Sequence, residues 1–444
     1  MPKLDFPDFA KDRGAWFWAR PKNLLASRRK FMRQDQSNVW RYAFEAANPP
    51  AVERSAALSE VIPDIGRPFR IAILGDTGEG DRSQYTLLPL LRAVRPDLMV
   101  INGDVAYPAG ELDDFTQGFF RPYTGLNIPV WATVGNHEYY SDNNGRNFYD
   151  VFCTRIFADQ WSQAGLRLVP QPGMYWELRD PSGTTPLVIL GLDSGKSGNL
   201  DGHDTFLSRI FAGRKRADDA QHRWLDWRLS LADTNGSKVV VLFHIPALVQ
   251  GKHDSDTHLG EVHRVLARHA SVRAVCCGHI HNHQQYLPAT LRDYMAGQFG
   301  AARGVSDNGG DGPQYIVNGN GGAALEATDF GGPFATQDRY PSVKQWRDYT
   351  GRVRRAAERT APGSVLARAI AQIESAKKPD DDPWGLQSFL LLDVNGPRIS
   401  VSRIFVDDLT ELFKNRDSVR VENPEPPLDR DTLRTRCTQA LFEL

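Results

Sequence analysis

The chain has 444 residues, of which 41 % are hydrophobic and 24 % are charged, with 53 basic residues against 54 acidic ones. This balance is typical of a globular protein and excludes a disordered or fibrous chain, while the length predicts one large catalytic domain with additions or two to three domains. A net charge of −1 argues against a dedicated nucleic-acid-binding protein, because such proteins carry a basic excess.

The sequence shows no sign of export or of membrane insertion. Its first residues contain no apolar run of signal-peptide length, and no window holds the roughly 18 uninterrupted apolar residues of a membrane span. The four cysteines are too few for a disulfide scaffold, and the adjacent pair Cys276 and Cys277 is expected to be buried free thiols in a strand. The four are Cys153, Cys276, Cys277 and Cys437. We therefore expect a soluble protein of the reducing cytoplasm.

Residues 1–66 show no strand-like alternation and are expected to form an N-terminal extension that is mostly helical. An aromatic group at 16–18 precedes a cluster of arginines and lysines that ends at Arg33. Residues 16–33 fit two interpretations, which are contact with acidic lipid or a partner, and a helix that packs its aromatics on the main body.

From residue 70 onward, short apolar runs that end in small or polar residues predict strands buried on both faces of a sheet. The runs occupy residues 70–74, 98–101, 129–134, 187–190, 238–243 and 272–276. Helical patterns at 221–231 and 261–269 lie between some of them. This alternation of strands and helices indicates an α/β layered fold.

The C-terminal third is less regular. Residues 297–323 are glycine-rich and predict loops around a strand at 314–317, and residues 341–378 predict two helices. Two strand-like runs then flank Asn395-Gly396, a strong hairpin signal, and the last twenty or so residues are expected to be a tail.

These patterns predict four parts. The chain divides into an N-terminal extension at 1–66, a catalytic core at 67–330, a helical insertion at 331–384, and residues 385–444, which contain a hairpin that completes the core and the tail.

Five of the predicted strands are followed by side chains that can bind a metal ion. The segments are Gly75-Asp76-Thr77-Gly78, Gly103-Asp104-Val105-Ala106-Tyr107, Gly135-Asn136-His137-Glu138, His244 and Gly278-His279-Ile280-His281. Open α/β sheets place their sites outside the carboxyl ends of the strands, and a glycine before a ligand lets the backbone approach a bound group closely. Each segment alone is typical of a turn, but the five together predict one shared site.

The residue types indicate which metals suit that site. Carboxylates, an amide oxygen, imidazoles and a phenol, without thiolates, suit first-row metals such as iron, zinc and manganese. Two such ions about 3.5–4 Å apart serve in-line displacement at phosphorus. The predicted substrate is therefore a phosphate ester, and no nucleic-acid-binding domain or transmembrane segment is evident.

In their order over residues 70–285, the five segments resemble the motifs of the calcineurin-like metallophosphoesterases. The segment Gln221-x-x-Trp224-Leu225, downstream of Leu192-Asp193-Ser194, agrees with the same family. The resemblance implies an α/β fold of four layers, α/β/β/α, in which two mixed β-sheets pack face to face. It also implies a binuclear metal-dependent hydrolase in which a hydroxide activated by the metals attacks phosphorus.

One position departs from the commonest members of this family. They carry Asp-x-His in the first segment, whereas this chain has Gly78, and Tyr107 follows Asp104 by three residues. The purple acid phosphatases show this paired change, with a tyrosinate in place of the histidine. Resemblance to that subgroup implies a phosphomonoesterase that holds iron(III) at the tyrosinate beside a divalent zinc, iron or manganese ion.

Carried over by motif position, the seven candidate ligands fall into two sets that share Asp104. Asp76, Tyr107 and His281 are expected to bind the iron(III), and Asp104 is expected to bridge the two ions. The divalent ion is expected to be held by Asn136, His244 and His279.

The resemblance also assigns residues that face the substrate. His137 is expected to face the phosphate, with Glu138 fixing its tautomer by a hydrogen bond. His253, nine residues after His244, falls where purple acid phosphatases carry a histidine that holds phosphate or protonates the leaving group.

Three further histidines have weaker support. His258 and His263 match no motif and are expected at the surface, whereas His283 either borders the second metal site or is exposed.

Two other functions stay open. A phosphodiesterase acting on nucleotides or other diesters would use the same metals, because the loops over the site select the ester. A catalytically silent binding protein on the same fold would show missing ligands, and none of the seven is missing.

Overall fold

The computed structural model describes residues 53–194, 212–247, 260–286, 312–323, 335–337, 387–405 and 437–444, apart from positions 79, 81, 86, 142 and 144. Residues 16–33, the predicted helices at 341–378, His253 and His258 lie outside this part of the chain. None of the described helices is both long and apolar enough to cross a membrane.

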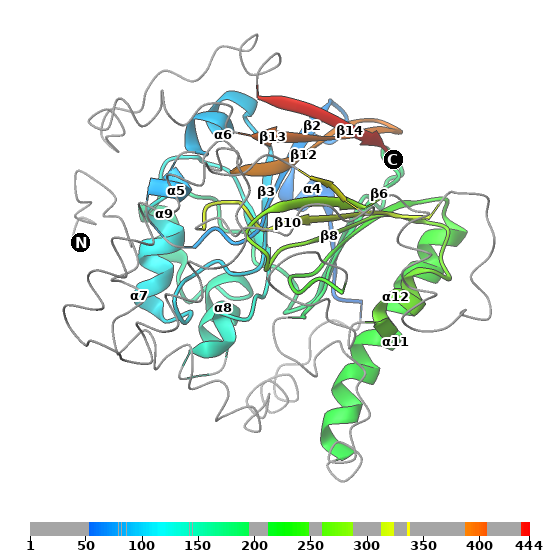
Figure 1. Cartoon of the computed structure of the whole chain (residues 1–444), viewed down its shortest axis with the longest axis horizontal. Helices are drawn as coiled ribbons and strands as arrows, with labels where there is room; N and C mark the ends of the chain where they lie inside the picture. Colours follow the sequence, from blue (N-terminus) through cyan, green and yellow to red (C-terminus); the bar gives the residue numbers. More distant parts are fainter. Residues whose placement is uncertain are drawn as a thin grey trace.

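Two mixed β-sheets form the centre of the molecule (Figure 1). The larger sheet runs in the order β1 (Ser55–Ala57), β5 (Trp176–Arg179), β6 (Leu187–Gly191), β7 (Lys238–Leu242), β8 (Val272–Cys277), β10 (Gln314–Asn318), β9 (His283–Tyr286) and β11 (Ala335–Gln337). The smaller sheet runs in the order β14 (Thr438–Glu443), β13 (Arg398–Phe405), β12 (Ser388–Asn395), β2 (Phe69–Leu74), β3 (Leu98–Asn102) and β4 (Val130–Thr133). All six predicted strands of the region 70–276 are present.

Helices cover the outer face of each sheet. The smaller sheet is covered by elements between β2 and β5, and α11 and α12 cover the larger sheet. The helical elements are α4 (Leu58–Val61), α5 (Arg82–Tyr85), α6 (Leu88–Val94), α7 (Leu112–Phe115), the π-helical turn η1 (Thr116–Phe120), the 3₁₀ turn η2 (Glu138–Tyr140), α8 (Arg146–Phe152), α9 (Ala158–Gln163), α11 (Ala212–Thr234) and α12 (Gly260–Leu266). The expected α/β/β/α sandwich is therefore confirmed.

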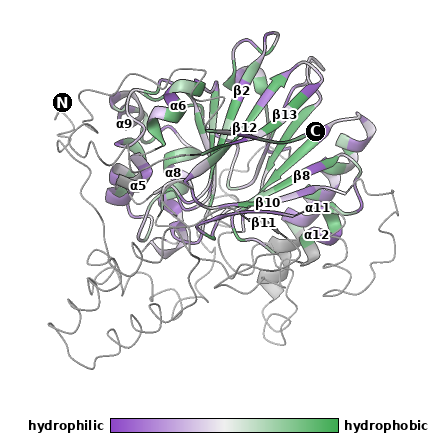
Figure 2. Ribbon diagram, turned by 45° about the horizontal axis from the view of Figure 1, so that its top comes forward, coloured by the Kyte–Doolittle hydropathy of each residue, from purple (hydrophilic) through white to green (hydrophobic). Residues whose placement is uncertain are grey.

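Strand β3 shows why the apolar runs lack alternation. All of its residues are buried, with Met99 and Ile101 packed toward the helices and Leu98 and Val100 packed between the sheets. A strand with apolar cover on both faces has no polar side, so its sequence reads as a continuous apolar run. The hydrophobic colour of the central strands in Figure 2 follows from this arrangement.

The two sheets are joined near one edge by tryptophans. Trp131 of β4 meets Trp176 of β5 edge to face, with ring centroids 4.9 Å apart and an interplanar angle of 80°. The indole N–H of Trp176 also donates to the carbonyl of Ala132 at 2.9 Å. Edge-to-face pairs of this kind stabilise a core by about 0.5–1.5 kcal/mol beyond their burial.

Strands β12 and β13 form the hairpin expected around Asn395-Gly396, and β12 pairs antiparallel with β2. Gly396 has a φ of +57°, a conformation that favours glycine in a tight hairpin turn.

Five strands lie where the sequence patterns predict none. Strands β5 and β9 lie inside the larger sheet, and three short strands lie at sheet edges. Strand β1 falls within the extension predicted at 1–66, β11 falls within the insertion predicted as helical, and β14 replaces the expected tail. Backbone hydrogen bonds hold such edge strands, and no residue of β14 is buried. Their sequences therefore lack the apolar pattern that marks a central strand.

Candidate metal centre

The candidate ligands lie on loops that follow the carboxyl ends of five strands. Strands β2, β3 and β4 of the smaller sheet run parallel to one another, as do β7 and β8 of the larger sheet. The loops after them carry Asp76, Asp104 with Tyr107, Asn136, His244, and His279 with His281. Both sheets therefore contribute candidate ligands to one edge of the sandwich, as expected for open α/β sheets.

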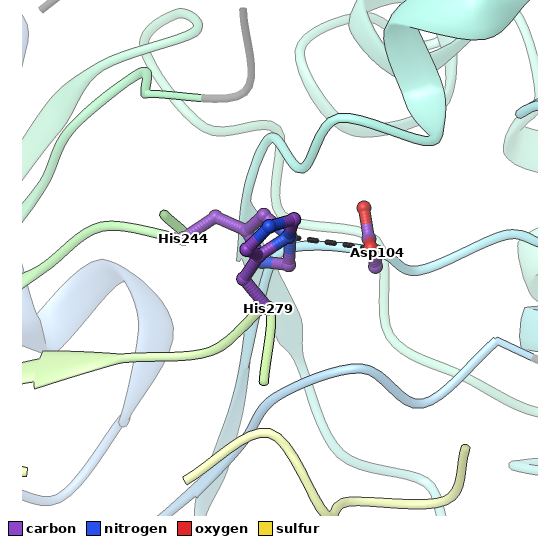
Figure 3. Close-up of side chains that lie close together, drawn as sticks. All are labelled: Asp104, His244 and His279. Atoms are coloured by element: carbon purple, nitrogen blue, oxygen red, sulfur yellow. Dashed lines mark ion pairs between the residues drawn. The ribbon is translucent and has the colours of Figure 1, made fainter. Parts of the chain in front are cut away.

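One set of donors centres on His244. Asp104, His244 and His279 each offer an atom that lies within 4.8 Å of the others, and the carboxylate of Asp104 faces both imidazoles (Figure 3). The Nε2 atom of His244 is 3.2 Å from Oδ2 of Asp104 and 3.1 Å from Oδ1 of Asn136. These four side chains are the ones expected to surround the divalent ion.

The second set centres on the phenol of Tyr107. Its hydroxyl is 3.1 Å from Oδ1 of Asp76, 3.1 Å from Oδ2 of Asp104 and 3.0 Å from Nε2 of His281. Because Oδ2 of Asp104 also faces His244, this one carboxylate oxygen borders both sets of donors. Seven oxygen and nitrogen donors arranged in this way fit a pair of first-row metal ions.

Gly78 lies directly against the loop that carries Tyr107. A Cβ atom at position 78 would lie 2.2 Å from the carbonyl oxygen of Val105, so no side chain fits there. The carbonyl of Gly78 accepts a hydrogen bond from the backbone N–H of Tyr107 at 3.0 Å. Position 78 therefore provides no side chain to this site, and the phenol of Tyr107 lies among the candidate ligands instead.

Three candidate ligands adopt a left-handed backbone conformation. The φ angles are +57° for Asp76, +50° for Asp104 and +71° for His279. Each of these residues follows a glycine, and a Cβ atom at Gly103 would lie 2.3 Å from the ring of His244. Strained backbone that the surroundings hold in place is found mainly at functional sites.

The strain at His279 predicts an unusual order of stability. His279→Gly should be more stable than His279→Ala by about 1 kcal/mol, because a left-handed conformation costs a residue with a Cβ atom roughly 1–2 kcal/mol. Urea unfolding of the metal-free variants would measure the difference. His281 is the matched control, since its φ is not positive and alanine should there be the more stable choice. An alanine variant that is the more stable at both positions would contradict the left-handed conformation of His279.

Buried carboxylates and imidazoles lie next to one another in the site and shift each other's pKa. Burial by itself raises the pKa of Asp104, but the imidazoles of His244, His137 and His279 outweigh it and hold that pKa well below its usual range. Burial lowers the pKa of His244, yet the carboxylates of Asp104 and Asp76 outweigh it and raise the pKa to about 9. Opposite charge therefore stabilises the charged forms of Asp104 and His244. Burial instead raises the pKa of Asp76 and, together with the nearby charge of Asp104, raises the pKa of Glu138 to about 8. A metal ion that binds His244 has to displace the proton from its imidazole.

The ring of His137 is held in one orientation. Its Nδ1–H donates to the carbonyl of Pro108 at 2.7 Å, and the ring packs against those of Tyr107 and Tyr140, with centroid distances of 4.2 and 4.7 Å. The Nε2 atom is 3.9 Å from Oδ2 of Asp104, and 17 % of the side chain is exposed. His137 thus directs Nε2 toward the donors.

Glu138 has a different role from the one expected. Its carboxylate accepts hydrogen bonds from the backbone N–H groups of Asp104, Ala106 and Gly135 at 3.1, 2.9 and 2.7 Å. The expectation that it fixes the tautomer of His137 is wrong, because turn η2 directs Glu138 into the core while the imidazole meets a carbonyl. Glu138 instead ties the loops after β3 and β4 together.

Tyr140 was not anticipated from the sequence. Its hydroxyl accepts a hydrogen bond from the side-chain Nδ2 of Asn136 at 2.7 Å, which turns Oδ1 of that amide toward His244. No motif marked Tyr140. Its position four residues after Asn136 is the one sequence signal, because residues four apart on a helical turn lie close together.

The other histidines are placed as follows. His263 is 4 % exposed and packs against Phe243 and Tyr315, so the expectation of a surface position is wrong. Helix α12 presents this face to the larger sheet, and burial lowers the pKa of His263 to about 4. His283 is also 4 % exposed, and its Nδ1 lies 2.8 Å from Oδ1 of Asn318.

Residues 69–283, which include all seven candidate ligands, match the family described as calcineurin-like phosphoesterase. They form a calcineurin-like phosphoesterase domain. The family inferred from the five segments is thus confirmed, and the domain is that of a phosphoester hydrolase whose fold is associated with a dinuclear metal centre.

Individual relatives are distant. A probable cyclic nucleotide phosphodiesterase from Moraxella catarrhalis is 25 % identical over 245 residues, which make up 50 % of this chain and 77 % of the relative. Among solved structures, the purple acid phosphatase PPD1 from yellow lupin seeds matches with a TM-score of 0.43 and 13 % identity over 77 % of this chain. The match covers 52 % of the lupin protein, so this chain spans about half of its length.

Two further structures match at a similar level. GAP50, the anchor in the inner membrane complex of Plasmodium, gives a TM-score of 0.45 and 12 % identity over 77 % of this chain and 86 % of its own. A dimetal phosphatase from Danio rerio gives a TM-score of 0.38 and 14 % identity, over 76 % of this chain and 98 % of its own.

Proposed function

We propose that this protein hydrolyses phosphate esters at a binuclear metal centre formed by the seven candidate ligands. The observation that carries the proposal is the position of Asp104, whose Oδ2 atom is 3.1 Å from the hydroxyl of Tyr107 and 3.2 Å from Nε2 of His244. A carboxylate between two sets of donors is suited to bridge two cations, the arrangement used for displacement at phosphorus.

The chain's own residues support the reaction in three ways. Asp76, Asp104 and Tyr107 supply negative charge for the two ions, which when bound would lower the pKa of water and stabilise charge that builds up on the phosphoryl group. Tyr140 orients the amide of Asn136. The Nδ1–H of His137 bonds the carbonyl of Pro108 and its Nε2 is directed toward Asp104 at 3.9 Å, and we assign Nε2 to the phosphate or the leaving group.

We propose that phosphomonoesters are the preferred substrates. The support is the pairing of Gly78 with Tyr107, the change that resembles the purple acid phosphatases, together with the lack of space for a side chain at position 78. The second candidate is a phosphodiesterase for nucleotides, which the relative from Moraxella catarrhalis favours by its name and its 25 % identity.

The test uses the full chain with its metal content measured. The protein is stripped with a chelator, reloaded with iron(III) and zinc or manganese, and assayed with p-nitrophenyl phosphate, bis(p-nitrophenyl) phosphate and a cyclic nucleotide. We expect two metal ions per chain and a higher kcat/KM for the monoester than for either diester. Higher values for the diesters would select the second candidate, and a chain that binds no metal and cleaves none of the three would overturn both.

The identity of one metal ion leads to a separate prediction. If the phenolate of Tyr107 binds iron(III), the loaded protein should be violet to pink because of charge transfer from the ligand, and Tyr107→Phe should abolish the colour by removing one oxygen atom. The measurement is the visible spectrum at equal iron content. Tyr123→Phe is the matched control, because this buried tyrosine bonds Gln84 and not a candidate ligand. A violet Tyr107→Phe variant, or a colourless and active iron(III)-loaded wild type, would show that Tyr107 is a packing residue.

A further inference from the structure

Asn102, the last residue of β3, connects the two sheets directly behind the metal centre. It is 2 % exposed, and its side-chain Nδ2 donates to the carbonyls of Cys276 at 2.8 Å and Phe243 at 3.3 Å. Both acceptors belong to the opposite sheet, at or just past the ends of β8 and β7. Its Oδ1 accepts a hydrogen bond from the hydroxyl of Thr133 on the neighbouring strand β4 at 2.9 Å. One amide thus joins the ends of four strands.

The backbone of the same residue contacts a candidate ligand. The carbonyl oxygen of Asn102 accepts a hydrogen bond from Nδ1–H of His244 at 3.0 Å. With Nδ1 occupied in this way, Nε2 of His244 is the nitrogen that faces Asp104 and Asn136. Partners that hold the second nitrogen of a metal-binding histidine fix both its tautomer and its ring orientation.

The two contacts act on His244 from both sides. The side chain of Asn102 bonds the carbonyl of Phe243, the residue before His244, and the backbone of Asn102 bonds the imidazole itself. The backbone of the next residue, Gly103, lies against the same imidazole, since a Cβ atom there would be 2.3 Å from Nδ1 of His244. The segment 102–104 therefore carries an amide, a close backbone contact and a carboxylate that all meet the loop after β7.

We infer that Asn102 is a positioning residue of the metal centre, which sets the separation between Asp104 on one sheet and His244 on the other. The inference rests on the proposed function, because it assigns Asn102 a role toward the divalent ion. Asp104 follows Asn102 by two residues in the loop after β3, while His244 follows Phe243 in the loop after β7. An amide that fixes the distance between these strand ends also fixes the distance between the ligands that they carry.

A buried amide that only stabilises the sandwich would behave differently, and Gln171 provides the comparison. It is also 2 % exposed, and its side chain bonds both backbone groups of Ala132 at 2.9 and 3.0 Å and the carbonyl of Gly173 at 3.0 Å. Asn102→Leu and Gln171→Leu each remove a buried amide that bonds backbone groups, but only the first acts next to His244.

The experiment measures binding of Co²⁺ to the metal-free full chain, in competition with a chelating indicator, and the visible spectrum of the Co²⁺-loaded protein. We expect Asn102→Leu to lower the affinity of the weaker Co²⁺ site about 10–100-fold, the usual effect of losing a partner of a metal ligand. Gln171→Leu should retain the wild-type affinity. Urea unfolding without metal should show both variants destabilised, which separates stability from positioning.

A milder variant covers the case in which Asn102→Leu does not fold. Thr133→Val removes only the hydrogen bond to Oδ1 of Asn102 and should weaken the same Co²⁺ site by a smaller factor. If the Asn102 or the Thr133 variant bound Co²⁺ as tightly as Gln171→Leu does, the inference would be overturned while the proposed function would stand. A wild-type chain that binds no Co²⁺ would overturn the proposed function itself.

Discussion

Asp104→Asn is expected to remove both metal ions and to lower kcat/KM by more than about 10⁴-fold, beyond the upper end of what a positioned acid or base contributes. The reason is the position of its Oδ2 atom, which borders Tyr107 and His244 at 3.1 and 3.2 Å. An asparagine would keep the size of the side chain but would withdraw the negative charge that both cations share. Metal analysis after gel filtration and steady-state kinetics on the reloaded protein measure the two effects.

The control for this variant is Asp393→Asn. Asp393 lies on β12, and its partly exposed carboxylate pairs with Arg70 at 2.7 Å. It should keep both metals and the full rate, because exposed pairs contribute little. If Asp104→Asn also kept two metals per chain and normal turnover, Asp104 would not be the bridging residue.

His137→Ala is expected to slow turnover about 10²–10⁴-fold while both metal ions stay bound. Its Nδ1–H bonds the carbonyl of Pro108 at 2.7 Å and orients the ring, so that Nε2 points toward the candidate ligand Asp104 at 3.9 Å. The measurement pairs kcat with metal content, because the prediction concerns the rate alone. His269→Ala is the control, since that imidazole bonds Asp226 and Asp233 and should leave both quantities unchanged.

An emptied metal site in His137→Ala would make His137 a ligand and would revise the assignment of the seven donors. His253→Ala is likewise expected to slow turnover while both metal ions stay bound. That residue lies outside the described part of the chain, and its role stays a prediction from the resemblance to purple acid phosphatases.

The left-handed conformations of Asp76, Asp104 and His279 connect the metal centre to stability. Each costs the folded chain of order 1–3 kcal/mol unless its surroundings compensate. Metal ions that bind these side chains only in the folded protein would offset that cost by mass action. The strained positions are therefore the ones at which binding and folding are most closely coupled.

The sequence by itself determined the family and the position of the site in the fold. Each central strand is buried on both faces, so it reads as an apolar run, and the polar residue that follows it marks the strand's carboxyl end. Because Asp76, Asp104, Asn136, His244 and His279 each follow such an end, their gathering at one edge could be predicted from local pattern alone.

The tertiary structure decided what surrounds these side chains. The carbonyl of Pro108, and not the carboxylate of Glu138, orients His137, and His263 is buried on the face of α12 that meets the larger sheet, although no motif marks it. Asn102 meets Cys276 across 174 positions of sequence. A sequence pattern of period 2 or 3.6 shows which face of an element is apolar. It does not show which polar atom meets another after two sheets have packed, because that depends on the distance and direction between elements far apart in the chain.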